Sequence, residues 1–112
     1  MIQHVLFVCT GNICRSPLAA SLLERALKDR GLDVNVTSAG TGAWDGAPAS
    51  EGGYLVGLEA GLGLSRHRAR LLTRELVEAA DLILTMARHH RARVDELGGE
   101  GKVFVLGEYA GK

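Results

Sequence analysis

The sequence predicts an α/β fold: a doubly wound parallel sheet of four strands in the order 2-1-3-4, with helices on both faces. Two observations support this prediction. Short runs of apolar, often β-branched residues are separated by longer stretches whose apolar residues recur at helical spacing. Such alternation is typical of strands joined by helical crossovers, and right-handed crossovers fix the face on which each helix packs.

The expected elements follow in order from the amino terminus. Residues 5–8 are an apolar, β-branched and aromatic run, which indicates a first strand. Pro17 to Arg30 is expected as a first helix, because its leucines fall on one face, with Ser16 as N-cap and Gly31 as stop. We expect further strands at residues 34–38, 82–86 and 102–106, and further helices at residues 50–60, 74–80 (capped by Thr73) and 87–97.

Composition and charge restrict the class of protein. A chain of 112 residues is large enough for one domain, and 13 basic against 13 acidic residues leave it near neutral. Near-neutrality argues against nucleic acid or a membrane surface as a partner, and no apolar run reaches membrane-spanning length. Met1 leads into a strand with no signal peptide, so we expect a cytoplasmic protein. The two cysteines, Cys9 and Cys14, are too few for a disulfide scaffold and make no metal-ligand spacing with His4, so we expect no metal.

The loop between the first strand and the first helix carries the most specific chemistry. It starts with the thiol of Cys9 and ends with the guanidinium of Arg15, and Gly11 and Asn12 between them tolerate unusual backbone angles. A loop curled here can turn its N–H groups inward and bind an anion, together with the Arg15 fork and the positive end of the following helix. The same field stabilises a thiolate at Cys9, which would then attack a bound phosphoryl group. The alternative is a buried structural cysteine in an ordinary strand-to-helix turn.

The full run that follows the first strand reads Cys9-Thr10-Gly11-Asn12-Ile13-Cys14-Arg15-Ser16-Pro17. It resembles the low-molecular-weight protein tyrosine phosphatase family, which carries this loop at the start of the chain. The resemblance implies hydrolysis of phosphotyrosine or a similar aryl phosphate through a phosphocysteine on Cys9, with no cofactor. It also implies that Ser16 stabilises the sulfur as it leaves. The phosphoryl oxygens would be bound by loop residues Thr10, Gly11, Asn12, Ile13, Cys14 and Arg15.

The resemblance also assigns roles outside the loop. A buried hydrogen-bond network would join Asn12, Ser16, Ser38 and His67 and hold the loop in its strained shape. His67 fits the family's His-x-x-Arg segment with Arg70. On composition alone, the basic run at residues 64–70 could be a phosphate or nucleic acid patch, with a solvated loop as the default because the chain as a whole is neutral.

Two further side chains, those of Trp44 and Cys14, have both a functional and an ordinary interpretation. The resemblance makes Trp44 an aromatic wall for the substrate ring, whereas general experience allows it simply to pack on the core. It makes Cys14 a partner that traps oxidised Cys9 as a reversible disulfide, whereas a small core residue is the ordinary role. We expect Asp45, beside Trp44, to be solvated.

His89 and His90 are adjacent in the helix expected at residues 87–97. Adjacent helical residues point in different directions, so the two histidines are a poor metal pair. We expect them on a solvated helix face.

The resemblance covers residues 1–112 as a single phosphatase-like domain but corresponds only to the larger, amino-terminal part of the family's domain. We therefore expect a C-terminally incomplete domain whose last helix is missing, so that the sheet face over the third and fourth strands is uncovered. Such a chain is expected to be a monomer or a weak dimer through that face. The family's Asp-Pro general acid has no counterpart, and Glu108 is the nearest candidate by topology, so we expect activity on good leaving groups only.

Two other functions share this loop. Arsenate reductases use the same fold, but they relay a disulfide through further cysteines, and no cysteine follows Cys14. A non-catalytic phosphate-binding module is the second alternative, because the general acid is missing. Phosphate binding without a phosphoenzyme would identify such a module.

Overall fold

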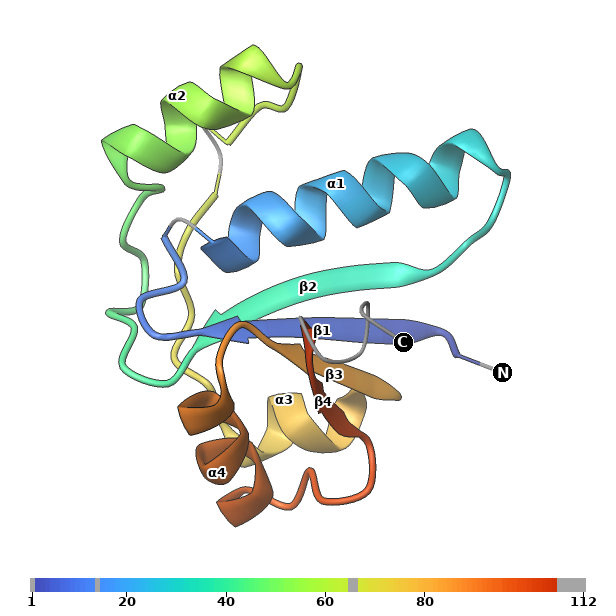
Figure 1. Cartoon of the computed structure of the whole chain (residues 1–112), viewed down its shortest axis with the longest axis vertical. Helices are drawn as coiled ribbons and strands as arrows, with labels where there is room; N and C mark the ends of the chain where they lie inside the picture. Colours follow the sequence, from blue (N-terminus) through green and yellow to red (C-terminus); the bar gives the residue numbers. More distant parts are fainter. Residues whose placement is uncertain (1, 14, 65–66, 107–112) are drawn as a thin grey trace.

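The computed structural model describes residues 2–13, 15–64 and 67–106. Its centre is a four-stranded parallel sheet in the order β2-β1-β3-β4, which confirms the predicted topology (Figure 1). Cys9 at the end of β1 pairs with Gly40 on β2, and Val8 pairs with Thr85 on β3. The strands are β1 (His4–Cys9), β2 (Asn35–Gly40), β3 (Leu82–Thr85) and β4 (Val103–Val105).

Helices cover both faces of the sheet, as right-handed crossovers require. Helix α1 (Arg15–Asp29) lies on one face, and α3 (Arg74–Ala79) and α4 (Arg88–Glu96) lie on the other (Figure 1). Helix α2 (Glu51–Glu59) lies on the same side as α1, farther from the sheet, so the crossover from β2 to β3 reaches the opposite face through α3.

Two apolar cores sandwich the sheet. Strand β1 is buried on both faces, which explains its unbroken apolar run rather than an alternating pattern. Because side chains alternate along a strand, its residues divide between the two cores. The core toward α3 and α4 contains Leu6, Val8, Val77, Ile83, Val94 and Val103; the core toward α1 contains Val5, Phe7, Ala20, Val36 and Leu84.

The α1 side of β3 and β4 is the less covered part of the sheet. Leu82, Met86 and Leu106 are partly buried there, and Phe104 is 38% exposed. In the part of the chain that the structure describes, α1 packs on β1 and β2 rather than over these residues. This agrees with the expected uncovered face, whereas the incompleteness of the domain stays a prediction.

Two helix starts test the capping predictions. Thr73 caps α3 as expected, with its Oγ1 accepting the N–H of Leu76 at 3.3 Å. The N-cap predicted at Ser16 is wrong: α1 begins at Arg15, and the Ser16 side chain lies inside the helix. Its hydroxyl bonds Cys9 and Asn12 instead, because tertiary partners replace the local capping bond.

The carboxylate of Asp81, the residue just before β3, binds the backbone at the start of β1. Asp81 Oδ2 accepts the backbone N–H groups of Gln3 at 2.8 Å and His4 at 2.9 Å. These two bonds are the main reason that the pKa of Asp81 is lowered from its ordinary value of 3.8. Hydrogen bonds to the ionised form favour that form, so the folded protein binds this proton more weakly than the unfolded chain.

Asp81→Ala is therefore expected to lower the Tm at neutral pH. A depressed folded-state pKa gives stability that is present above about pH 4 and is lost as the pH falls through the folded-state pKa. The difference in Tm between the variant and the unsubstituted chain should shrink in acid, as measured by circular dichroism. Asp33→Ala, at another exposed aspartate, is the control; an equal loss in both variants would contradict this role of Asp81.

Candidate active site

The loop that contains the predicted nucleophile leaves β1 at the carboxyl edge of the sheet. Cys9 is the last residue of β1, and the chain passes through residues 10–13 to the start of α1 (Figure 1). From β1 the connections run to β2 in one direction and then back across to β3. The carboxyl edge at such a reversal is where open α/β sheets bind their ligands.

Four carbonyl oxygens of the loop, those of Cys9, Thr10, Asn12 and Ile13, accept hydrogen bonds from other segments of the chain. Residues 41–42 follow β2, residue 50 precedes α2, and residue 67 follows α2. The bonds are Thr41 N–H to Cys9 O at 2.9 Å, Gly42 N–H to Thr10 O at 2.9 Å, His67 Nε2–H to Asn12 O at 2.6 Å and Ser50 N–H to Ile13 O at 2.7 Å.

Outward carbonyls imply inward N–H groups. The described peptide bonds contain no cis bond, and in a planar trans peptide the C=O of one residue is antiparallel to the N–H of the next. The N–H groups of Thr10 and Gly11 therefore turn away from the scaffold, as does that of Ile13. Within the described residues these three groups donate no hydrogen bond. The loop thus presents a concavity lined by backbone donors, the arrangement that binds an anion.

Asn12 is the residue that fixes this shape. It is fully buried and is the only described non-glycine residue with a positive φ, at 56°. Its Nδ2 donates to Ser16 Oγ at 2.8 Å, and its Oδ1 accepts the N–H of Arg70 at 2.9 Å. Its own N–H points at Cys9 Sγ, 3.2 Å away. Strained backbone of this kind persists where the surroundings over-determine it.

The thiol of Cys9 lies at the base of the concavity. It is free and 3% exposed, and its sulfur lies 2.9 Å from Ser16 Oγ. Because Ser16 Oγ already accepts a hydrogen bond from Asn12, its own proton is available for the sulfur. Two donors, the Asn12 N–H and the Ser16 hydroxyl, are therefore placed to stabilise a negative charge on Cys9.

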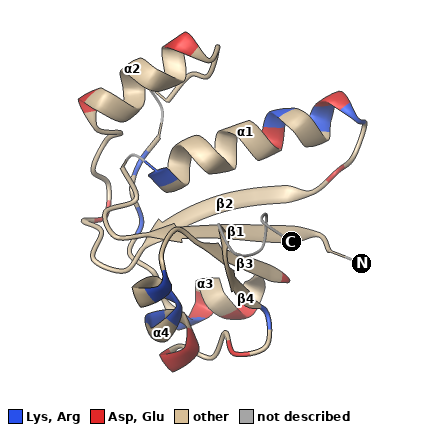
Figure 2. Cartoon of the chain, viewed as in Figure 1, with Lys and Arg blue, Asp and Glu red and all other residues tan. Residues whose placement is uncertain are grey.

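Positive charge gathers beside the loop. Arg15 is exposed and is the first residue of α1, a helix of 15 residues. Its positive charge therefore adds to the positive end of the helix dipole. Basic residues also occur in the segment between α2 and α3, which passes close to the start of α1 (Figure 2). The site therefore suits a ligand with more than one negative charge.

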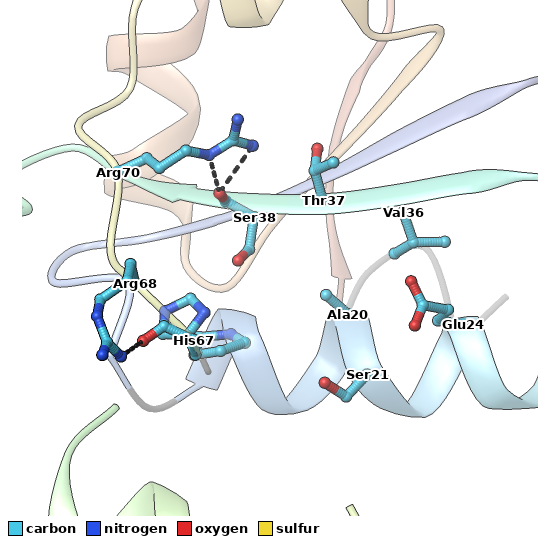
Figure 3. A pocket seen from close by; sticks show the side chains of 10 residues that line it. Ala20, Ser21, Glu24, Val36, Thr37, Ser38, His67, Arg68 and Arg70 are labelled. Carbon is cyan, nitrogen blue, oxygen red and sulfur yellow. Dashed lines mark hydrogen bonds between the residues drawn. The ribbon is translucent and has the colours of Figure 1, made fainter. Parts of the chain in front are cut away.

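The segment at residues 67–70 holds the back of the loop rather than lying free in solvent. Besides the His67 bond to Asn12, the Arg70 side chain donates through Nε and Nη2 to the Ser38 carbonyl, both at 3.3 Å (Figure 3). Arg68 turns back to the His67 carbonyl at 2.7 Å. Asn12, Ser16 and His67 are thus joined by side-chain bonds as expected, whereas Ser38 is tied in through its backbone oxygen and Arg70.

A cavity of about 240 Å³ lies behind the loop, between α1 and β2 (Figure 3). His67, Arg68 and Arg70 line one side, and Glu24 on α1 lines the other. None of the described loop residues, 9–13 and 15, lines it. The cavity is therefore separate from the concavity above Cys9.

Trp44 stands out from the surface beside the loop. It is 84% exposed, which rules out the interpretation that it packs on the core. Its segment is tied to the loop because Gly42 donates to the Thr10 carbonyl. Asp45, expected to be solvated, also accepts the Leu71 N–H at 2.7 Å, so it ties the segment that carries Trp44 to the chain before α3. Contact of Trp44 with a substrate stays a prediction.

The prediction of a solvated face is wrong for His90. Its side chain is fully buried, and its ring bonds Thr10 Oγ1 on one side and the Ala87 N–H on the other. His89 is exposed, as expected. The sequence spacing could have indicated this burial, because His90 lies four residues before the apolar Val94 and therefore on the same, buried face of α4.

Two predicted residues, Cys14 and Glu108, lie outside the described residues. Among those described, no group of three His, Cys, Asp or Glu side chains could hold a metal ion. Nor is any of the described helices both long and apolar enough to cross a bilayer.

Comparison with known proteins decides the family. The family model described as low molecular weight phosphotyrosine protein phosphatase matches residues 4–112. This chain belongs to that family. Its fold, its loop after β1 and the placement of Cys9 at the end of β1 all agree with membership.

The similarity extends over nearly the whole chain. A probable low molecular weight protein-tyrosine-phosphatase, EpsP, of Ralstonia solanacearum is 46% identical over 110 residues, which are 96% of this chain and 73% of that protein. A protein-arginine-phosphatase of Bacillus subtilis is 40% identical over 109 residues, 96% of this chain and 72% of that one. The crystal structure of the tyrosine phosphatase Wzb from Escherichia coli K30 in complex with sulphate superposes with a TM-score of 0.89 at 34% identity, over 97% of this chain and 75% of that one. The protein is therefore a phosphatase.

Gly40→Ala is expected to damage the site while leaving the sheet in place. A Cβ on Gly40 would collide with the carbonyl oxygen of Thr10 and approach the nitrogen of Asn12 to 2.9 Å, so the loop would have to shift. Displacement of a reacting group by about 1 Å costs on the order of 100-fold in rate, so we expect that loss in kcat/KM with p-nitrophenyl phosphate.

The matched control for this substitution is Gly42→Ala. Its Cβ would meet only Thr10 Cγ2 at 3.8 Å and Thr10 O at 4.0 Å, which are ordinary contacts. Near-normal kcat/KM in Gly42→Ala beside a large loss in Gly40→Ala is the expected pattern. Full activity in Gly40→Ala would show that the loop does not need its present position.

Proposed function

We propose that this chain is a protein tyrosine phosphatase that hydrolyses phosphotyrosine and other aryl phosphate monoesters through a phosphocysteine on Cys9. The observation that carries the proposal is the position of Cys9 Sγ, 3.2 Å from the Asn12 nitrogen and 2.9 Å from Ser16 Oγ, at the base of a donor-lined concavity. A thiol placed there meets the phosphorus of any phosphate monoester that the concavity binds.

The backbone donors and Arg15 hold the phosphoryl group. The N–H groups of Thr10, Gly11 and Ile13 supply hydrogen bonds, and the Arg15 fork matches two phosphoryl oxygens. In phosphoryl transfer the negative charge stays on these oxygens through the transition state, so fixed donors stabilise it without rearranging. Arg15 and the loop N–H groups thus supply the positive charge that holds the phosphoryl oxygens.

Cys9 then attacks in line. The thiolate forms the S–P bond as the bond from phosphorus to the aryl oxygen breaks, and the phenolate that leaves takes up a proton. In the second step water attacks phosphorus, the S–P bond breaks, and inorganic phosphate leaves. The Ser16 hydroxyl donates to the sulfur as negative charge returns to it, so its contribution is greatest in this second step.

Apolar surface beside the concavity favours an aromatic leaving group. Ile13 is partly buried in the loop, and Trp44 offers an exposed flat ring on the tied segment after β2. A phosphoarginine side chain would instead call for a carboxylate beside its guanidinium, and one oxygen of Asp45, the carboxylate next to Trp44, already accepts the Leu71 N–H. The arginine phosphatase among the relatives makes this choice of substrate one that needs testing.

The chemistry of the Cys9 thiol indicates the compartment in which the protein acts. A catalytic thiol works only while it is reduced, so we propose that the protein acts in a reducing compartment, the cytoplasm. We propose that it does so as a monomer, or as a weak dimer through the apolar face around Phe104, which is 38% exposed.

A rapid-quench experiment with p-nitrophenyl phosphate tests the mechanism. We expect a burst of about one nitrophenolate per chain before the steady rate, because the first step forms a covalent intermediate that accumulates. Intact-mass spectrometry of the quenched protein should show one added phosphoryl group. Cys9→Ala, which leaves no nucleophile at this position, should give neither the burst nor the added mass.

The alternatives give different results in the same experiment. Tight binding of inorganic phosphate with no burst and no phosphoenzyme would identify a phosphate-binding module.

Comparison of two peptides of one sequence, phosphorylated on tyrosine or on arginine, tests the substrate. We expect the larger kcat/KM for phosphotyrosine, and a preference for phosphoarginine would overturn the substrate class while leaving Cys9 as nucleophile.

A further inference from the structure

His90 connects the loop to the far side of the molecule. Its ring is fully buried at the start of α4, with Nε2 2.9 Å from Thr10 Oγ1 and Nδ1 3.0 Å from the Ala87 nitrogen. The other anchors of the loop described above come from segments that flank β2 and α2. His90 is the anchor that comes from α4, on the opposite face of the sheet (Figure 1).

The hydrogen bonds of His90 define its protonation state. The Ala87 N–H is a donor, so Nδ1 must accept and carries no proton. The proton of the neutral ring is then on Nε2, which donates to Thr10 Oγ1. A ring in this state cannot relay protons through Nδ1 without breaking its bond to Ala87, so His90 is not a general acid.

The electrostatic surroundings keep the ring neutral. Burial lowers the pKa of His90 from its ordinary value of 6.5, and the charges of His89 and Arg15 lower it further. His89 faces it at a ring-centre separation of 4.0 Å. Protonation would put two donors, Nδ1–H and the Ala87 N–H, against each other and add a charge beside Arg15. Both effects oppose protonation of His90 at a pH at which an exposed histidine already takes up a proton.

The hydrogen bond from His90 reaches Thr10, the residue directly after Cys9 in the anion-binding loop. Thr10 contributes the first inward N–H, and its carbonyl is bound by Gly42 from one side. His90 binds the Thr10 side chain, so Thr10 is held both by the segment that follows β2 and by α4. Without the second bond, Thr10 could turn about its remaining anchor.

We propose that His90 is a positioning residue for phosphate binding: as a neutral Nε2–H donor it fixes Thr10 and thereby the first backbone donors of the loop. This inference rests on the phosphate-binding loop proposed above and extends the site to α4. A histidine that served only packing and the start of α4 would leave phosphate affinity unchanged when its bond to Thr10 is lost.

Two substitutions separate the two bonds of His90. His90→Asn keeps an acceptor near the position of Nδ1 for Ala87 but has no donor that reaches Thr10, whereas His90→Gln has a donor near the position of Nε2. Affinity for inorganic phosphate is measured by calorimetry at pH 8, with Tm recorded in parallel. A lost hydrogen bond typically weakens an interaction by about three- to tenfold, so we expect that rise in the dissociation constant for His90→Asn and its recovery in His90→Gln. His89→Asn, the same change one residue away at an exposed position, should leave the affinity unchanged.

Thr10→Val gives a second route that leaves the α4 side chain intact. It removes the hydroxyl with little change in shape, so we expect a similar loss of phosphate affinity, and no additional loss when it is combined with His90→Asn. Unchanged affinity in Thr10→Val would overturn the proposal even if His90→Asn failed to fold.

Nuclear magnetic resonance of the histidine ring nitrogens gives an independent readout in the unsubstituted protein. We expect His90 to carry a protonated Nε2 and a bare Nδ1 at neutral pH, because Nδ1 accepts the Ala87 N–H and Nε2 lies against Thr10 Oγ1. A protonated Nδ1 at neutral pH would overturn the proposal. Failure of the unsubstituted protein to bind phosphate would instead defeat the proposed function, so the two failures are distinguishable.

Discussion

The buried amide of Asn12 joins parts of the molecule that are far apart in the sequence. It binds Ser16 at the start of α1 and the backbone of Arg70 in the segment before α3, and its own N–H points at the Cys9 sulfur. A residue in the left-handed region costs on the order of 1 to 3 kcal/mol, and a buried amide that loses a partner costs about as much. Each bond therefore holds a shape that the loop would not keep alone, and removal of one bond leaves the others to support an unfavourable backbone.

The fold supplies the fixed points to which this network attaches. Strand β1 is in the interior of the sheet and is buried on both faces, so Cys9 at its end has little freedom. The neighbouring crossovers then bring residues 41–42, residue 50 and residue 67 to the same edge, where they bind the loop carbonyls. Because these bonds hold the carbonyls outward, the N–H groups of Thr10, Gly11 and Ile13 turn into the concavity. The anion site is thus a consequence of how the loop is held rather than of charged side chains alone.

Much of the fold could be predicted from the sequence because its information is local. Alternating strands and helices with right-handed crossovers leave few topologies, and the order 2-1-3-4 is the observed one. The loop was recognisable because its residue types have specific tasks: a thiol, a residue that accepts positive φ, and a guanidinium at the start of a helix. Thr73 was recognisable as a cap because that bond lies within one turn.

The errors arose where a distant partner decides the structure. Ser16 has the sequence context of an N-cap, yet Cys9 and Asn12 offer its hydroxyl better partners in three dimensions. His90 is part of a basic helix and reads as solvated, yet Thr10, 80 residues earlier, lies against its ring. Ser38 enters the network through its carbonyl, a group that every residue has, so no side-chain pattern could have shown it.

The most direct test of this account is the affinity of Asn12→Gly for inorganic phosphate, measured by titration calorimetry beside the unsubstituted chain. Glycine adopts the positive φ of 56° without strain, so this variant keeps the backbone freedom and removes only the bonds of the side chain. If those bonds hold the loop, affinity should fall at least about tenfold while the Tm shows that the sheet is intact. Phosphate binding as tight as that of the unsubstituted chain would show that backbone conformation alone shapes the site, and the account built on the Asn12 network would be wrong.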